Sequence, residues 1–306
     1  MTPAGEWLAR AALAARLTSG RPGLWVSGAI GALAYAGWLP LVLVVGSAPR
    51  TSDFAFLGAD LYASPLFPFN VLFVAFLFAM VVVVACALAA LGEAVLLRQL
   101  GGAPTGRPLG RDAGTTLSVI LVAALPVAVA VGAAALGLAS VAPAVFTSPD
   151  IGGPVLVRLS GALAPYLLGL VAALLVGQAW GAGAMRRALA DPPPSLGASL
   201  VGGLRDLLTR PARRIGLALV GTFADLIAVL LAIGVLRMVW SRIEGDLASA
   251  GPVDPAALPL LLGFVTIWLV LVLVAGLLHA WISAWWSLEL STTGLEATVQ
   301  GEEVAR

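Results

Sequence analysis

Long runs of apolar residues, separated by short polar segments, set the pattern of this chain. Six such runs each hold about 20 residues or more, which is enough for a helix to cross roughly 30 Å of hydrocarbon. The runs cover residues 22–46, 68–91, 115–140, 159–180, 215–236 and 257–282. We therefore predict an all-α polytopic membrane protein with six transmembrane helices, forming a single transmembrane domain over residues 1–306.

The arginines between these spans predict the orientation of the chain. Twelve Arg lie in the segments 1–21, 92–114 and 181–214, whereas the alternate segments hold only Arg50, Arg158, Arg237 and Arg242. Short loops rich in Arg stay on the cytoplasmic side of a membrane. We therefore expect three successive hairpins with both termini in the cytoplasm.

One segment between the spans has the pattern of a surface helix. Ser195 follows three prolines and can cap a helix over residues 195–209. One face of that helix is expected to carry Leu196, Leu200, Leu204, Leu207 and Leu208. We expect the helix to lie flat at the cytoplasmic interface, either as an elbow into the fifth span or as the docking site of a cytoplasmic protein partner.

Small residues at helical spacing indicate where the spans pack, because helices in lipid associate by close backbone approach. We call each such row a seam. The seam of the fourth span is Gly161, Pro165, Gly169, Ala173, Gly177 and Gly181, and that of the fifth is Ala218, Gly221, Asp225, Ala228 and Ala232. Both seams should face other helices. Pro40, Pro126 and Pro165 should kink their spans, and the carbonyls freed there need partners inside the bundle.

Asp225 is the only Asp, Glu or Arg within the six predicted spans. Placing an Asp at the centre of a membrane helix costs about 2.5–3.5 kcal/mol on insertion scales. Thr222 lies one turn earlier on the same helix, and Tyr35 and Thr266 lie at similar depth on other spans. Asp225 is expected to serve either as a neutral acid that clamps two helices by a hydrogen bond or as a relay for a proton or substrate.

Composition narrows the possible chemistry. Of the 306 residues 60% are hydrophobic and 11% are charged, whereas a soluble domain is nearer half apolar and about a quarter charged. The net charge of +1 indicates no nucleic-acid partner. One His and one Cys, Cys86, exclude the usual zinc ligand sets. We therefore expect no metal and no cofactor.

The polar residues near the ends of the spans do not form a catalytic motif. His279 and Ser283 are four residues apart, but no Gly-x-Ser-x-Gly turn accompanies them. His279 is expected to be an interfacial residue, and Glu93 and Gln178 are expected to be solvated or to snorkel to the surface. No catalytic residue is identified, and an enzyme is not expected.

The three hairpins with amphipathic inner elbows, such as "SLGASLVGGLRDLLTRPARRIGLALV", resemble a group of bacterial and archaeal proteins. These are the six-helix membrane domains attached to glycerophosphodiester phosphodiesterases, and related stand-alone proteins. The phosphodiesterase domain is absent from this sequence, so the resemblance implies a helical membrane module without that activity.

Two functions follow as hypotheses. The first is a non-catalytic integral membrane protein that scaffolds or assists partners in the cytoplasmic membrane of a prokaryote. Its surroundings are then the lipid bilayer, and a homo-oligomer is one arrangement it could adopt. The second is the permease subunit of a transporter for a lipid or hydrophobic substrate, which works with a separate ATPase docked at residues 195–209.

Overall fold

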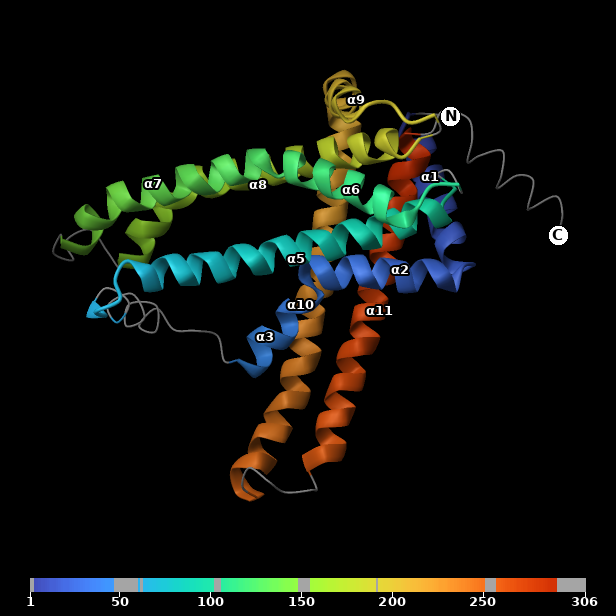
Figure 1. Ribbon diagram of the computed structural model, residues 1–306. Coiled ribbons are helices and arrows are strands. Elements are labelled where there is room, and N and C mark those ends of the chain that lie inside the picture. The colour runs from blue at the N-terminus through green and yellow to red at the C-terminus, as the bar shows by residue number, and fades with distance from the viewer. Residues whose placement is uncertain are drawn as a thin grey trace. The chain divides into compact units, whose positions relative to one another are not determined.

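The computed structural model is almost entirely helical over the residues it describes, which are 3–46, 60, 63–101, 106–147, 155–190, 192–250 and 257–290 (Figure 1). Its elements are α1 (Pro3–Ser19), α2 (Pro22–Ala32), the π-helix η1 (Leu33–Gly37), α3 (Leu39–Val45), α5 (Phe69–Gln99), α6 (Leu109–Ala123), α7 (Leu125–Thr147), α8 (Val155–Ala188), α9 (Leu196–Thr209), α10 (Pro211–Ala250) and α11 (Ala257–Leu290). No strand occurs among these residues. The predicted all-α class is therefore confirmed.

Five stretches of helix are long and apolar enough to cross a membrane. They are Phe69–Gln99, Leu109–Gly137, Leu163–Ala188, Pro211–Gly245 and Leu258–Leu290. A sixth is obtained if the bent pair Pro22–Gly37 and Leu39–Val45 counts as one span. The chain thus has the helices of a multi-pass membrane protein, and each of the six predicted spans falls on them.

The first predicted span is a broken helix. α2 passes into the π-helix η1, and α3 then continues at an angle of 46°. Pro40 lies in the first turn of α3, where an amide N–H has no helical partner, so a proline fits the start of the new helix. At the break, the indole Nε1 of Trp268 on α11 donates a 2.9 Å hydrogen bond to the carbonyl of Gly37. This carbonyl therefore has a hydrogen-bond partner on another helix.

Most helices continue beyond the apolar runs that predicted them. α5 extends eight residues past position 91, because Gly92–Gln99 contains no helix breaker. It ends just before Gly101, whose φ of +80° is the left-handed conformation that glycine adopts after a helix. The added turns bring Glu93 and Arg98 onto α5. Hydropathy therefore located the spans correctly but placed their ends too early.

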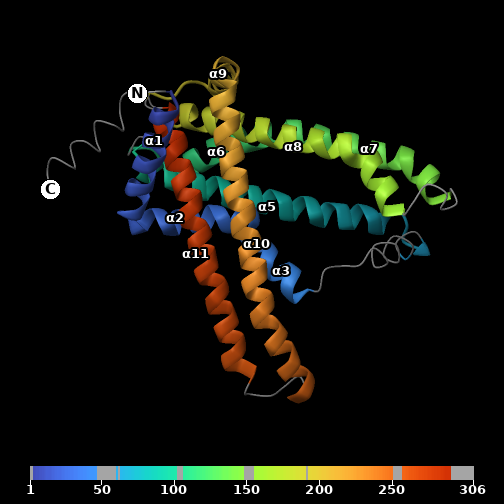
Figure 2. The ribbon, with the colours of Figure 1, turned by 180° about the vertical axis from the view of Figure 1, so that it is seen from behind.

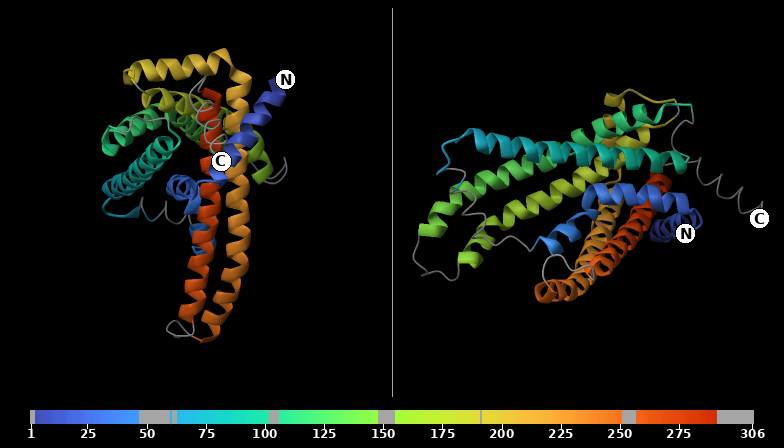
Figure 3. Two further views of the ribbon diagram at one scale, coloured as in Figure 1. Left: turned by 90° about the vertical axis from the view of Figure 1, so that its right-hand side faces the viewer. Right: turned by 60° about the horizontal axis from the view of Figure 1, so that its bottom comes forward.

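The helices fall into two compact units, which are described separately below. The first unit comprises residues up to Leu117 and from Phe223 onward, and the second comprises Ser118–Thr222. In the first unit α2 packs across both α11 and α5, and α11 runs beside α10 (Figures 2 and 3). The helices α6 and α10 each contribute residues to both units.

Glycines allow the helices of the first unit to approach closely. A Cβ at Gly276 of α11 would lie 2.6 Å from Cα of Ala29 and 2.7 Å from the carbonyl oxygen of Trp25, both on α2. A Cβ at Gly92 of α5 would lie 2.8 Å from the amide nitrogen of Gly31 on α2. Real Cβ atoms do not come this close, so α2 contacts both neighbours backbone to backbone.

An N-terminal helix that was not predicted, α1, packs on the C-terminal part of α11. The rings of Trp7 and Trp285 have centroids 4.5 Å apart, and Trp281 Nε1 donates to the carbonyl of Ala11 at 3.0 Å. Arg10 and Glu289 form an ion pair of 3.5 Å, in which the Glu289 side chain is 2% exposed. α1 thus covers the end of α11.

The second unit is built on α8, which packs against α7 and α9. The predicted seam of α8 makes close contacts only in part. A Cβ at Gly177 would lie 2.6 Å from the carbonyl oxygen of Ala123, whereas Gly161 and Gly169 face open space. α8 also continues through Pro165 without interruption. Close packing is therefore confined to the C-terminal half of the seam.

The predicted helix 195–209 is present as α9, and its predicted cap is confirmed. Ser195 accepts a hydrogen bond from the amide of Ala198 at 3.2 Å. The buried face of α9 consists of Ser199, Gly203 and Leu207, so it shares only Leu207 with the predicted face of leucines. A Cβ at Gly203 would lie 2.7 Å from the amide nitrogen of Ala184 on α8, so small residues set this contact. Most of the leucines remain uncovered.

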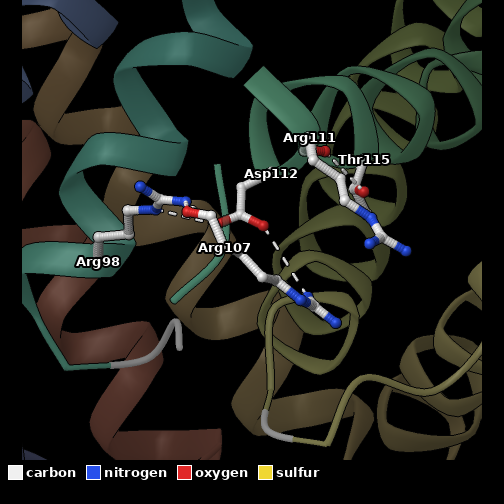
Figure 4. A network of polar contacts seen from close by, with 5 residues as sticks. All are labelled: Arg98, Arg107, Arg111, Asp112 and Thr115. Atoms are coloured by element: carbon white, nitrogen blue, oxygen red, sulfur yellow. Dashed lines mark hydrogen bonds and ion pairs between the residues drawn. The ribbon is translucent and has the colours of Figure 1, made fainter. Parts of the chain in front are cut away.

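A polar network pins α6 to the end of α5 (Figure 4). Asp112 on α6 is fully buried and lies between two arginines. Its Oδ2 accepts from Arg98 Nε at 2.9 Å and from Arg98 Nη2 at 2.6 Å, and its Oδ1 lies 3.9 Å from Arg107 Nη1. Arg98 Nη2 also donates to the carbonyl of Arg107. One buried acid therefore links the end of α5 to the start of α6.

Candidate functional site

A small cavity opens between α10, α11 and the broken helix in the first unit. Three polar side chains line it, namely Asp225 from α10, Tyr35 from η1 and His279 from α11. The rest of its wall is almost entirely apolar and includes Ala228, Ala232, Trp268 and Ala275. The Asp225 side of the α10 seam thus faces other helices. The cavity measures about 50 Å³, which is space for water and not for a large solute.

The π-helix helps to form this wall. A π-turn carries one more residue per turn than an α-helix and is often found at functional sites. Tyr35 lies in the middle of η1, and its ring centroid is 5.7 Å from that of His279. The broken helix therefore brings an aromatic hydroxyl-bearing side chain beside the only histidine of the chain.

Behind His279, a carboxylate is buried. His279 Nε2 lies 2.7 Å from Oε1 of Glu93 on α5, and Ser283 Oγ donates to Oε2 of Glu93 at 3.4 Å. Glu93 is only 6% exposed. The expectation that Glu93 is solvated or snorkels is therefore wrong, and His279 is a cavity residue with a carboxylate partner.

Glycines make room for this pair. A Cβ at Gly31 would lie 2.9 Å from His279 Nε2, so the missing side chain lets the imidazole lie against α2. Gly92 precedes Glu93 and contacts the backbone of Gly31. The close crossing of α2 and α5 thus places the Glu93 carboxylate within reach of α11.

An apolar cluster adjoins the cavity at Trp268, and the cavity is open where Tyr35, which is 49% exposed, and Asp225 line it. Val44 of α3, Leu236 and Ile243 of α10 and Phe264 of α11 are each at most 3% exposed. Trp268 packs against this cluster and also lines the cavity. Polar groups therefore continue from the cavity in the direction of Glu93 and Ser283, and apolar side chains continue in the direction of Phe264.

The four residues predicted as clamp or relay candidates do not all meet. Asp225 and Tyr35 share the cavity, whereas Thr222 and Thr266 are not among its lining residues. Thr222 Oγ1 bonds to Gln178 Oε1 and to the carbonyl of Ala218, each at 2.9 Å. Thr266 Oγ1 donates to the carbonyl of Leu262 at 2.8 Å. No hydrogen bond or ion pair joins Asp225 to any residue that the structure describes.

Sequence reasoning missed the partnership of Glu93 with His279. One signal was present, because His279, Ser283 and Ser287 recur every four residues and so share one face of α11. Glu93 lies two residues beyond the apolar run 68–91, so it was assigned to the loop. The spacing of polar residues on α11 could have indicated that a polar partner faces them.

The site holds two carboxylates, one imidazole and one phenol within an apolar surrounding. Within the described part of the chain, no group of three or more His, Cys, Asp or Glu is placed to hold a metal ion. A carboxylate and an imidazole at 2.7 Å can exchange a proton, and the cavity beside them has space for water. Proton binding and transfer is the chemistry that these residues allow.

Comparisons with family models, with curated proteins and with solved structures gave no match for this chain.

Proposed function

We propose that this multi-pass membrane protein is a transport protein in which Glu93, His279 and Asp225 take up and release protons within the membrane. The hydrogen-bonded pair of Glu93 Oε1 and His279 Nε2, at 2.7 Å, carries the proposal. Ionisable residues inside a membrane bundle are costly, and they typically mark ion paths and proton relays. A lone Asp225 favoured a structural clamp, but Asp225 and His279 line one cavity and Glu93 contacts His279, which favours a relay.

The size of the cavity supports a small transported species at this site. A space of about 50 Å³ accommodates water, which can carry a proton between Asp225 and His279. A lipid or another large hydrophobic molecule does not fit. The proposal therefore concerns proton movement, and it assigns no larger substrate to this cavity.

The experiment that tests the proposal measures proton flux into proteoliposomes. Purified protein is reconstituted with a trapped pH dye, and a potassium diffusion potential drives protons inward. Asp225→Asn and Glu93→Gln each remove a proton-binding group with little change of shape. Thr266→Val serves as the control, because Thr266 lies on α11 outside the cavity and bonds only to the carbonyl of Leu262 among the described residues.

We expect wild-type protein and Thr266→Val to move protons at the same rate. Asp225→Asn and Glu93→Gln should slow the flux about 100-fold, the lower end of what a positioned acid–base group contributes. Wild-type liposomes that take up protons no faster than protein-free liposomes would overturn the proposal. Unchanged flux in Asp225→Asn would show that Asp225 takes no part in the proposed proton transfer.

The exposed side of α9 favours a second candidate function, that of an accessory protein that docks a cytoplasmic partner. Val201 and Leu208 are 67% and 70% exposed, and Leu196 and Leu204 are also uncovered. If the accessory function is correct, a strain that lacks the gene should be complemented by Asp225→Asn protein but not by the α9 variant Val201→Ser/Leu208→Ser. If the transport function is correct, Asp225→Asn protein should fail to complement that strain.

A further inference from the structure

A row of polar residues leads away from the cavity along α11. His279, Ser283 and Ser287 are spaced by four residues, so they lie on one face of the helix, which we call the α11 polar face. Ser283 is 3% exposed and Ser287 is 7% exposed. Their neighbours Ala280, Ala284 and Leu288 are fully buried. The polar face is therefore enclosed by protein.

Hydrogen bonds connect this face to Glu93. Glu93 uses one carboxylate oxygen toward His279 Nε2 at 2.7 Å and the other toward Ser283 Oγ at 3.4 Å. Ser287 Oγ donates to the carbonyl of Ser283 at 3.0 Å. Glu93 thus stands between the cavity residue His279 and the part of α11 that α1 covers.

A charged pair follows the α11 polar face near the end of the helix. Glu289 comes two residues after Ser287, which places it on a different side of α11, and it forms the ion pair with Arg10 of α1. Arg10 is 28% exposed in its side chain, so this pair reaches the surface of the first unit. The contact that carries the inference is therefore the one between Ser283 and Glu93.

We propose that Ser283 positions the Glu93 carboxylate for proton transfer to His279. This inference rests on the proposed transport function and adds a residue that orients its central pair. Ser283 acts through Glu93 and is a positioning residue.

The transfer involves one proton at each step. Glu93 takes a proton from a hydronium ion, which leaves water, and becomes a neutral acid. It passes that proton to His279 Nε2, which gives an imidazolium and restores the carboxylate. The imidazolium then releases the proton of its other ring nitrogen through cavity water to the carboxylate of Asp225, and a neutral imidazole remains.

Three of the elements around His279 contribute a titratable group near it, whereas α2, which packs against α11, carries none. Glu93 comes from α5, Tyr35 from η1 and Asp225 from α10, and Cys86 of α5 interacts electrostatically with Tyr35. A pH titration of His279 therefore reports on the whole site. Because His279 is the only histidine, its ¹⁵N resonances need no assignment by mutagenesis.

The test combines proton flux with this titration in three variants of full-length protein. Ser283→Ala removes the hydroxyl, Ser283→Thr retains it, and Thr266→Val removes a hydroxyl of the same helix away from the polar face. We expect Ser283→Ala to slow proton flux about tenfold, the effect of losing one hydrogen bond to a charged group. Ser283→Thr should recover most of the flux, and Thr266→Val should match wild type.

The ¹⁵N titration separates positioning from a general loss of structure. Ser283→Ala should displace the titration midpoint of His279, because the Glu93 carboxylate loses a donor, whereas Thr266→Val should leave it unchanged. Wild-type flux and an unchanged midpoint in Ser283→Ala would overturn the positioning role of Ser283 but leave the proposed function intact. Absence of flux in wild type would instead overturn the proposed function on which this role depends.

Discussion

Glu93 and His279 are 186 residues apart in the chain, and their side chains meet at 2.7 Å between α5 and α11. Replacing His279 with Ala removes the partner of a buried carboxylate, and we expect a loss of about 1–3 kcal/mol in the free energy of unfolding. Glu93→Gln retains a hydrogen-bonding group and should cost less. Unfolding in detergent, followed by Trp fluorescence, provides the measurement.

The double variant Glu93→Gln/His279→Ala is the control for this pair. Because each substitution removes the same interaction, the two losses should sum to more than the loss in the double variant. Strictly additive losses would show that the two side chains do not stabilise one another.

The Arg contacts of Asp112 and of Asp206 should differ in their contribution to stability. Asp112 is fully buried between Arg98 and Arg107, so Asp112→Asn leaves two partly buried arginines without their anion. We expect a loss of about 3–5 kcal/mol, as for breaking a buried pair. The matched control is Asp206→Asn, since Arg187 is 48% exposed in its pair with Asp206 and solvent screens that contact. Its cost should be at most about 1 kcal/mol.

Both variants can be compared by their thermal midpoints in the same detergent. An Asp206→Asn midpoint lower than that of Asp112→Asn would reverse the expected order and would contradict the role of Asp112 as the buried anchor of α6.

Two glycines of α11 should respond to alanine with opposite signs. A Cβ at Gly276 would lie 2.6 Å from Cα of Ala29, so Gly276→Ala must separate α2 from α11. A Cβ at Gly263 would lie in open space. Gly263→Ala should therefore only raise the helix propensity and stabilise the protein by about 0.5–1 kcal/mol. Thermal midpoints of the two variants test this, and a stabilised Gly276→Ala would contradict the backbone contact.

The spans could be predicted because a membrane helix must satisfy its backbone internally and present apolar side chains to lipid. The same reasoning could not place the helix ends, because hydropathy reports where side chains become polar, whereas a helix ends only at a residue that stops it. Glu93 shows the consequence, since it lies two residues past the apolar run and yet on the same helix.

The candidate site was only partly predictable for a second reason. Asp225 and Tyr35 were identified from their depth in the spans, and both line the cavity. The pairing of Glu93 with His279 depends on how α5, α2 and α11 cross, which is set by close contacts at Gly31, Gly92 and Gly276. Seams of small residues occur on several helices, and sequence spacing does not tell which of them meet. Gly169 belongs to such a seam, yet a Cβ placed there would lie in open space.

The predicted topology can be tested by cysteine labelling in intact cells. After Cys86→Ala, single cysteines are introduced at Pro192, before α9, and at Ala250, at the end of α10. We expect a membrane-impermeant maleimide to label position 250 and not position 192, since Arg-rich segments stay cytoplasmic. Permeabilised cells, in which both sites should react, are the control. Labelling at 192 in intact cells would reverse the orientation.

Trp268 should stabilise the broken helix through its indole N–H. The bond from Nε1 to the carbonyl of Gly37 is 2.9 Å long and occupies an oxygen at the break. Trp268→Phe retains an aromatic ring but removes the donor, and we expect a loss of about 1 kcal/mol. Trp240→Phe is the matched control, because Trp240 packs in the same cluster and its indole nitrogen bonds to no described residue.

Trp268 also separates the cavity from the apolar cluster, so Trp268→Ala should have a larger effect. It removes the ring as well as the donor, and substitutions of this kind cost about 3–5 kcal/mol in packed cores. Because Trp268 lines the cavity, removing its ring should also raise the passive proton flux through Asp225→Asn protein, in which the relay is blocked. The flux of Trp268→Ala/Asp225→Asn in proteoliposomes measures this. A rate equal to that of Asp225→Asn alone would show that Trp268 stabilises the break without limiting proton passage through the cavity.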